Sequence, residues 1–154
     1  MREQLRPSSR CPELQERLDR VRRGIHAACV VCGSTNGRGL RVPYRALSDG
    51  SVEAEFACDE SLEGYPHLLH GGVIASLLDG AMTNCLFAHG ITAVTAELSI
   101  RYRDPVPTEQ PVTVRARIQR SAHGCHFLTA EVRRHGRAAV IAHGKFLSRD
   151  RELR

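Results

Sequence analysis

The 154-residue chain has no tryptophan, and aromatic residues make up only 5 % of it. Proteins that bind single-stranded nucleic acid need aromatic side chains on which bases stack, so this composition gives that function little support. No segment approaches the ~20 consecutive apolar residues of a membrane-spanning helix. The first residues also lack the apolar core of a signal peptide. We therefore expect a cytoplasmic protein with neither a nucleic-acid partner nor a membrane partner.

The six cysteines are scattered and do not form the pattern of a secreted disulfide framework. Cys29 and Cys32 form a Cys-x-x-Cys pair, with Cys11 and His26 nearby. Two thiolates at this spacing often supply half of a tetrahedral zinc site. No second Cys-x-x-Cys or histidine pair follows in the sequence. We therefore expect no structural disulfide, no metal and no cofactor, with zinc binding and redox use of the pair as the alternatives.

Arginine dominates the positive charge of the chain, whose formal net charge is +5. Four arginines, Arg17, Arg20, Arg22 and Arg23, cluster in one N-terminal segment. A solvated basic surface is the ordinary explanation, and attraction of a phosphorylated ligand such as coenzyme A is the alternative. One isolated basic helix is not a helix-turn-helix, so the cluster does not predict DNA binding.

The length fits one domain. Near the N-terminus, apolar residues recur at three- and four-residue spacing and predict a short amphipathic helix, with Gly24 as its C-terminal cap. These residues are Leu14, Leu18, Val21 and Ile25.

The middle of the chain predicts a hairpin followed by a long helix. Asp49-Gly50 is a strong turn signal between two expected strands, Leu40–Tyr44 and Val52–Phe56. A loop over residues 61–70 then leads into an apolar helix from about Gly71 to Ala88. This helix is apolar on most sides, so we expect it to need more cover than one sheet face provides.

Beyond Gly90 the hydrophobic period changes from helical to two, which predicts antiparallel strands. In the first of them Val94 and Tyr102 share the apolar face, and Thr95 falls on the polar face. One long helix with a meander of strands is an α+β layout. The expected strands cover residues 94–102, 112–118, 126–133 and 140–147.

The segment His70–Asp79 combines a glycine pair with a lone carboxylate. At a helix start, Gly71 and Gly72 allow close approach of a ligand to backbone N–H groups that have no partner within the helix. Such donors attract an oxygen that carries negative charge. Two turns later, Asp79 falls on an apolar helix, where an unpaired carboxylate is costly to bury. The segment therefore indicates a functional site.

This segment resembles the PaaI-type hotdog-fold acyl-CoA thioesterases, which share a His-Gly-Gly step followed by Asp or Glu at the position of Asp79. The resemblance extends over residues 29–148. It implies an α+β hotdog fold, with a curved antiparallel sheet wrapped around a long central helix. It also implies a homodimer, often paired into a tetramer. Further matching segments are Cys29–Gly33, Asn36, Gly39–Leu40, Gly64–Pro66 and Arg101–Val106.

The resemblance divides the chain into three parts. Residues 1–28 are an N-terminal tail and short helix, residues 29–148 are the thioesterase domain, and residues 149–154 are a polar C-terminal tail. The implied reaction is hydrolysis of an acyl-CoA thioester to free acid and coenzyme A.

In that reaction the Gly71 N–H polarises the thioester carbonyl, and Asp79 acts on water as base, or on the carbonyl as nucleophile. Eight residues separate the two, which is about 12 Å along one helix. We therefore expect Gly71 of one subunit to meet Asp79 of the other. Thr95 matches a position where some relatives carry a Ser or Thr that helps hold the attacking water.

The remaining expected site residues bind substrate. His70 is more typical of a structural hydrogen bonder than of a base, and Gly72 provides room. The others are Tyr65 and His67 at the mouth, Met82 as a pocket wall, and Arg101 and Arg103 facing coenzyme A phosphates.

Two positions depart from the family pattern: Gly80 stands where many relatives have Glu, and Gly64 where some have Asn. The acyl group is not readable from the sequence. One alternative function is a non-catalytic acyl-CoA-binding or regulatory protein. Another is an acyl-thioester dehydratase, which would need a histidine paired with the acid, and His70 is the only near candidate.

Overall fold

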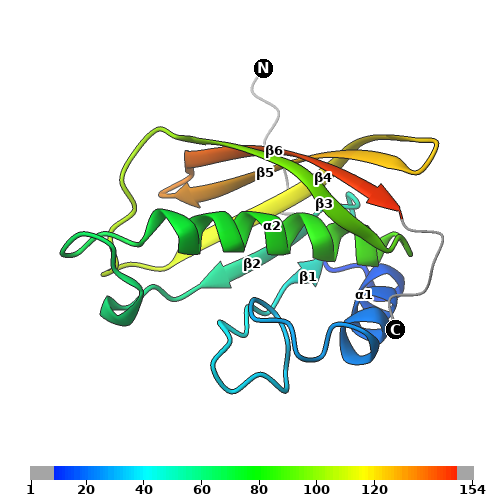
Figure 1. The fold of residues 1–154 in the computed structure, drawn as a ribbon, viewed down its shortest axis with the longest axis horizontal. Coiled ribbons are helices and arrows are strands. Elements are labelled where there is room, and N and C mark those ends of the chain that lie inside the picture. Colours follow the sequence, from blue (N-terminus) through cyan, green and yellow to red (C-terminus); the bar gives the residue numbers. More distant parts are fainter. Residues whose placement is uncertain (1–8, 149–154) are drawn as a thin grey trace.

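The helix α2, Gly71–Ala88, lies at the centre of the structure, and a curved sheet wraps around one side of it (Figure 1). The computed structural model describes residues 9–148. The expected C-terminal tail and the start of the expected N-terminal tail lie outside these residues. The other elements are α1 (Pro12–Gly24), β1 (Arg45–Ala46), β2 (Val52–Phe56), a short 3-10 helix (Glu60–Leu62), β3 (Ala93–Tyr102), β4 (Val112–Ala122), β5 (Cys125–Arg134) and β6 (Arg137–Ser148).

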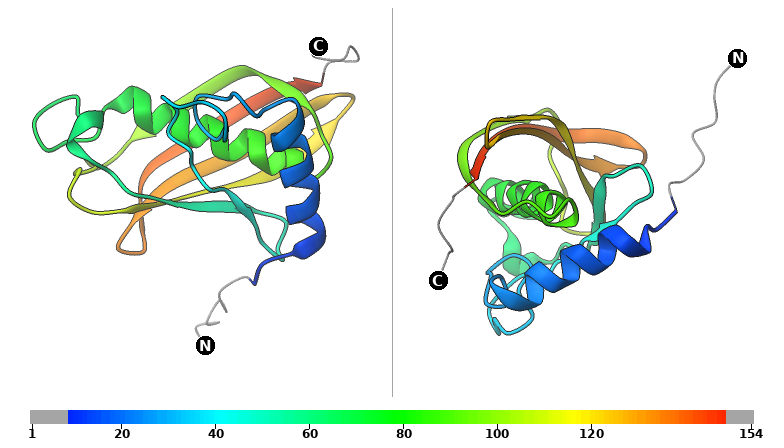
Figure 2. Two further views of the ribbon diagram at one scale, coloured as in Figure 1. Left: turned by 90° about the horizontal axis from the view of Figure 1, so that it is seen from below. Right: turned by 90° about the vertical axis from the view of Figure 1, so that its right-hand side faces the viewer.

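The six strands form one antiparallel sheet in the order β1-β2-β4-β5-β6-β3. Seen along α2, the sheet curves over the helix and α1 crosses on the opposite side (Figure 2). The expected α+β hotdog architecture, with its short N-terminal helix, is confirmed. Because β3 is an edge of the sheet, the outer side of its backbone has no strand partner among the described residues.

The apolar composition of α2 is explained by its place in the core. Of the helices in residues 9–148, only α2 is long and apolar enough to cross a membrane by length and composition, and 61 % of it is buried inside the fold. Its residues Leu77, Leu78 and Leu86 are fully buried against the sheet and α1. Burial of apolar surface on this scale is the main term that stabilises the fold.

The hairpin at Asp49-Gly50 is confirmed, but the strand expected over Leu40–Tyr44 is wrong. The first strand of the hairpin is β1, only two residues long. The Tyr44 ring instead enters the core, and its hydroxyl donates a hydrogen bond of 2.7 Å to the carbonyl of Leu77. Because the Tyr44 side chain reaches the middle of α2, the backbone at this position does not pair with a neighbouring strand.

The end of α1 also differs from the expectation. The helix includes Gly24, but this glycine is not in a left-handed capping conformation, and the next residue, Ile25, is exposed. The apolar spacing therefore predicts burial correctly for Leu18, which is fully buried, and fails for Ile25, the first residue after the helix.

A bulge in β3 changes which side chains face the helix. Thr95 pairs with Phe146 and Leu98 pairs with Gly144, with a register shift between Thr95 and Glu97. Because directly paired residues share a face, and Phe146 is fully buried, Thr95 points toward α2. The expectation that Thr95 lies on the polar face is therefore wrong. A prediction that assumes strict alternation omits the extra residue that a bulge inserts, so it places the residues on one side of the bulge on the wrong face of the sheet.

Candidate active site

The first turn of α2 carries backbone donors without a partner among the described residues, and that of Gly71 is one of them. His70 is the N-cap residue, and its Nδ1 accepts a hydrogen bond of 2.8 Å from the N–H of Gly72. The preceding donor, the N–H of Gly71, makes no hydrogen bond within residues 9–148. A first-turn N–H has no acceptor inside its own helix, so this donor is free for a ligand.

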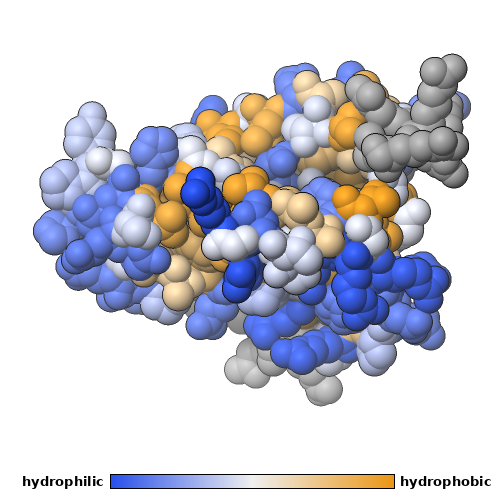
Figure 3. Space-filling model, turned by 60° about the horizontal axis from the view of Figure 1, so that its bottom comes forward, coloured by the Kyte–Doolittle hydropathy of each residue, from blue (hydrophilic) through white to orange (hydrophobic). Residues whose placement is uncertain are grey.

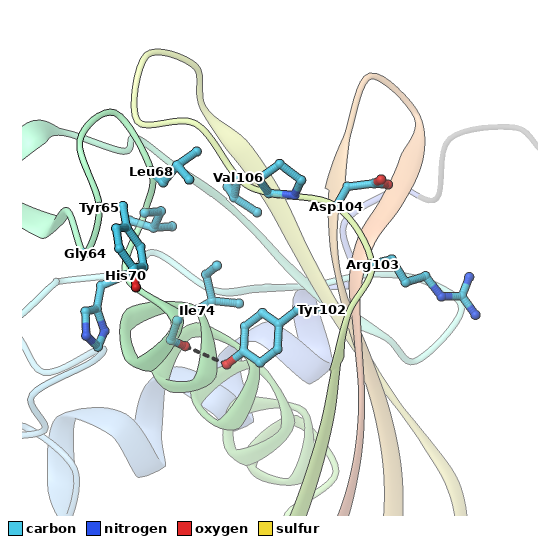
Figure 4. Close-up of a pocket in the computed structure, with 12 residues that line it drawn as sticks. Gly64, Tyr65, Leu68, His70, Ile74, Tyr102, Arg103, Asp104 and Val106 are labelled. Atoms are coloured by element: carbon cyan, nitrogen blue, oxygen red, sulfur yellow. Dashed lines mark hydrogen bonds between the residues drawn. The ribbon is translucent and has the colours of Figure 1, made fainter.

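Tyr102, at the end of β3, fixes the position of that turn. Its hydroxyl donates a hydrogen bond of 2.7 Å to the carbonyl of Gly71 (Figure 4), although the residue is 50 % exposed. Partial burial raises the pKa of the Tyr102 hydroxyl, which keeps it a donor at neutral pH. Sequence reasoning placed Tyr102 on the apolar face and missed this contact. Its position at the exit of the strand, in line with the helix start, was the available signal.

A cavity of about 560 Å³ opens beside this helix start. Its walls come from three places: the loop before α2, the first turn of α2, and the segment after β3. The loop and the segment are joined by a hydrogen bond of 2.8 Å from the N–H of Leu69 to the carbonyl of Val106. Tyr65 and Arg103 lie at the rim, where the Arg103 guanidinium points away from the Tyr102 ring (Figure 4).

Asp79 lies two turns further along α2, half-buried and facing β3. The Thr95 hydroxyl donates a hydrogen bond of 2.7 Å to its Oδ1, and its Oδ2 accepts none within residues 9–148. Burial raises the pKa of Asp79, while the Thr95 hydrogen bond and the charge of His26 act in the opposite direction. The site therefore holds a carboxylate with one oxygen fixed and the other available, and its basicity exceeds that of an exposed aspartate.

Within one chain, Gly71 and Asp79 do not meet. The cavity beside Gly71 is lined by neither Asp79 nor Thr95. Their eight-residue separation along α2 corresponds to about 12 Å. A single thioester carbonyl spans no such distance.

Three expected substrate contacts lie elsewhere. Met82 is fully buried, and its sulfur packs over Gly144 of β6, so it belongs to the core rather than to a pocket wall. His67 is exposed near Glu109, outside the cavity lining. Arg101 pairs with Ile141 on the outer face of the sheet, also away from the cavity.

The glycines at positions 80 and 64 are explained by close packing. A Cβ on Gly80 would lie 2.6 Å from Cγ1 of Val31 and 2.8 Å from the hydroxyl of Tyr44. A Cβ on Gly64 would lie 3.1 Å from the ring of His70. The segment before β1 therefore occupies the space that a side chain at position 80 would need.

One group of metal-ligand side chains comes together in the described part of the chain. Ligand atoms of His26, Cys29 and Cys32 all lie within 4.8 Å of one another. Burial raises the pKa of the Cys32 thiol to about 11 and lowers the pKa of His26. Sequence reasoning noted His26 only as a neighbour of the cysteine pair.

The chain shares sequence and fold with known thioesterases. Residues 67–141 match the model of the thioesterase superfamily. A stretch of 59 residues is 37 % identical to acyl-coenzyme A thioesterase THEM4 of Mus musculus, covering 38 % of this chain and 25 % of that protein. The chain thus spans about a quarter of the length of the curated relatives that it matches.

Two solved structures extend the likeness to nearly the whole chain. A thioesterase superfamily protein is 25 % identical and superimposes with a TM-score of 0.77, covering 96 % of this chain and 70 % of that one. The PaaI protein of the E. coli phenylacetic acid degradation operon has the same fold at 14 % identity and a TM-score of 0.74, covering 89 % and 94 %.

The free donor at the start of α2 and the half-buried carboxylate on the same helix both lie inside the matched region. Over residues 67–141 the chain is therefore similar to the thioesterase superfamily. Its fold is that of the PaaI-type hotdog proteins, as the motifs around His70 indicated.

Proposed function

We propose that the protein hydrolyses acyl-CoA thioesters to a free acid and coenzyme A. The free N–H of Gly71, at the mouth of a cavity of about 560 Å³, is the observation on which this proposal rests. A backbone donor fixed at a helix start stabilises the negative charge that develops on a thioester carbonyl under attack. The mouse relative's name, an acyl-coenzyme A thioesterase, supports the substrate class.

Asp79 acts on the attacking water in this proposal. Its Oδ1 is occupied by the Thr95 hydroxyl, so the other carboxylate oxygen orients water or takes its proton. A pKa raised by burial brings the carboxyl closer to the working pH, which makes it a better base than an exposed aspartate. The same oxygen is also the atom that would attack if the reaction ran through an anhydride.

The complete site requires a second copy of the chain. The described part of α2 leaves one stripe partly open, at the i, i+3 and i+4 positions Gly72, Ser76, Asp79 and Thr83. This stripe runs beside β3, an edge strand of 10 residues. Apolar residues, interrupted by hydrophilic ones, also lie across the middle of one face of the molecule (Figure 3).

A two-fold pair that covers this stripe brings Gly71 of one protomer toward Asp79 of its partner. We propose this homodimer as the working unit and a pair of dimers as the tetramer. The oligomeric state is measured by light scattering, and a monomer that is fully active at assay concentration contradicts the shared site.

The residues around the cavity place the two ends of the substrate. Arg103 lies at its rim with its guanidinium directed outward, where it is able to meet coenzyme A phosphates. Ile74 and Leu68 supply apolar walls deeper in the cavity, which suits an acyl chain or ring. His70 holds the helix start through Gly72 rather than pairing with Asp79, an arrangement that disfavours the dehydratase alternative.

The proposal is tested with a panel of acyl-CoA thioesters carrying short, medium and aryl acyl groups. Turnover is followed through the loss of thioester absorbance, because six cysteines would react with a thiol reagent. Gly71→Pro should lose about 10²- to 10³-fold in kcat, as expected for one oxyanion donor. Gly71→Ala keeps the N–H and is the matched control. Ligand-induced stabilisation without turnover for any thioester would instead support the acyl-CoA-binding alternative.

A further inference from the structure

The turn between α1 and the segment before β1 gathers three side chains that bind soft metal ions. His26, Cys29 and Cys32 follow one another at intervals of three residues, and their ligand atoms lie within 4.8 Å of one another. Nδ1 of His26 is 3.5 Å from Sγ of Cys32. A tetrahedral zinc site with Zn–S near 2.3 Å and Zn–N near 2.0 Å separates sulfur and nitrogen by about 3.5 Å. The observed spacing therefore fits two ligands of one ion, and it also fits a hydrogen bond between the two groups.

The backbone of this turn holds the sulfur of Cys29 in place. The N–H of Val31 donates to Sγ of Cys29 at 3.4 Å, and the N–H of Gly33 donates to the carbonyl of Cys29 at 2.9 Å. A Cβ at Gly33 would collide with the backbone of Ala27 and Cys29, so only glycine permits a turn this tight. The turn therefore keeps the sulfur of Cys29 close to that of Cys32, and the thiolate is the form in which cysteine binds metal.

A second contact to the cluster comes from α2. Nδ2 of Asn84 donates to Sγ of Cys32 at 3.4 Å and to the carbonyl of Gly80 at 2.8 Å, which fixes the orientation of the amide. Oδ1 of the same side chain is buried without a hydrogen-bond partner in the described residues. A water bound to a metal is a donor of the kind that this oxygen lacks. The ring of His26 is held edge-on against Phe87, with 5.0 Å between ring centroids.

We propose that His26, Cys29 and Cys32 bind one Zn²⁺ ion, with water in the fourth position. Two thiolates and a neutral imidazole balance the charge of the dication, so the half-buried cluster carries no net charge. A hydrogen bond from a Cys32 thiol to His26 would explain one of the three contacts but not the convergence of Cys29. The ion would tie His26, just after α1, to the turn that carries Cys29 and Cys32, next to Asn84 of α2. The proposal is independent of thioester hydrolysis.

The direct test is elemental analysis of the untagged chain after exposure to zinc and removal of free ions. We expect about one zinc per chain, and at least tenfold less in His26→Ala, Cys29→Ser and Cys32→Ser. Cys11→Ser and Cys58→Ser are the matched controls and should keep the full amount. Cys11 lies at the other end of α1, about 20 Å from the cluster. Metal-free parent protein, or undiminished zinc in the three ligand variants, would overturn the proposal.

Measurements on the unaltered chain cover the case in which a ligand variant does not fold. Cobalt(II) bound in place of zinc should give the near-ultraviolet charge-transfer bands of thiolate coordination together with the visible bands of a tetrahedral site. A chelator should lower the melting temperature, and zinc but not magnesium should restore it. A cobalt spectrum without thiolate bands would count against the site, as would a Cys29–Cys32 disulfide that persists in the zinc-treated protein.

Discussion

Two inactive variants of this protein should regain activity when they share a dimer. Gly71→Pro removes the oxyanion donor, and Asp79→Asn removes the carboxylate. Because the two positions lie about 12 Å apart along α2, each site in the proposed dimer takes one of them from each chain. A mixed dimer of the two variants then has one site with both changes and one site with neither.

The expected recovery follows from counting. Random assortment of equal amounts makes half of the dimers mixed, and each mixed dimer has one of its two sites intact. Activity per chain should therefore reach about a quarter of that of the parent protein. The separate variants should each retain about 1 % or less, because an oxyanion donor and a general base are worth about 10²- to 10⁴-fold. The difference between about a quarter and about 1 % of the parent activity distinguishes a shared site from a site within one chain.

The structure makes both variants conservative in shape. Gly71 is the first residue of α2, where proline is favoured and its missing N–H breaks no helical bond. His70 before it has φ −60° and ψ 134°, a conformation that proline permits in its neighbour. A Cβ at Gly71 finds its nearest atom at 3.6 Å, on Tyr102, so Gly71→Ala is a fair control. Asparagine at position 79 still accepts from Thr95.

The assay uses two differently tagged chains that are co-expressed, purified through both tags and compared with either variant alone. Doubly selected mixed dimers should show about half of the parent activity per chain, since every molecule has one intact site. Activity no higher than that of the separate variants would refute the shared site, because every site within a single chain would then carry a change.

Asp79→Asn should also stabilise the fold at neutral pH. Burial raises the pKa of Asp79, so the cost of ionising this carboxyl in the fold is fully present above the raised pKa and absent below the ordinary one. The gain in melting temperature should therefore shrink as the pH falls between the two and vanish below the ordinary carboxyl range. Thr95→Ala removes a hydrogen bond that favours the ionised form of Asp79, so the acid limb of the pH profile of kcat/KM should move to higher pH. Thr95→Ser keeps the hydroxyl and should leave the limb in place. An unmoved limb in Thr95→Ala would show that the hydrogen bond between Thr95 and Asp79 does not affect the reaction. Gly80→Ala should lower the free energy of unfolding by about 1–3 kcal/mol in urea titrations, because its Cβ would lie 2.6 Å from Val31 and 2.8 Å from Tyr44. A variant more stable than the parent would show that Val31 and Tyr44 move aside easily.

The elements of the fold that could be predicted are those with long, regular patterns. Apolar residues over Gly71–Ala88 and the alternation after Gly90 identify the central helix and the four long strands. The strand expected over Leu40–Tyr44 failed because the alternation there reflects burial of a tyrosine against α2, and not pairing in the sheet. The local sequence pattern indicates which side chains are buried, but it does not indicate which element they pack against.

The same limit applies to the site, where local patterns identify some residues and the others depend on contacts between distant segments. Gly71 and Asp79 stand out because a glycine pair and a buried charge are costly without a function. Thr95 reaches Asp79 only because a bulge at Ala96 shifts the register of the strand by one residue. No residue type in the strand predicts that shift. The third ligand beside Cys29 and Cys32 depends on the turn that follows α1, so sequence spacing alone left it as a neighbour.

The surroundings of Asp79 show why the helix has an open stripe. The sheet covers one side of α2, and Val31 and Tyr44 pack so tightly against Gly80 that the opposite side admits no side chain there. Between them lies β3, whose bulge supplies the Thr95 hydroxyl and whose outer edge has no partner within residues 9–148. A half-buried carboxylate next to an unpaired strand edge is unfavourable in an isolated chain. In the proposed dimer, a second copy seated along that edge would cover both features, and its helix start would bring the Gly71 N–H to the site at Asp79.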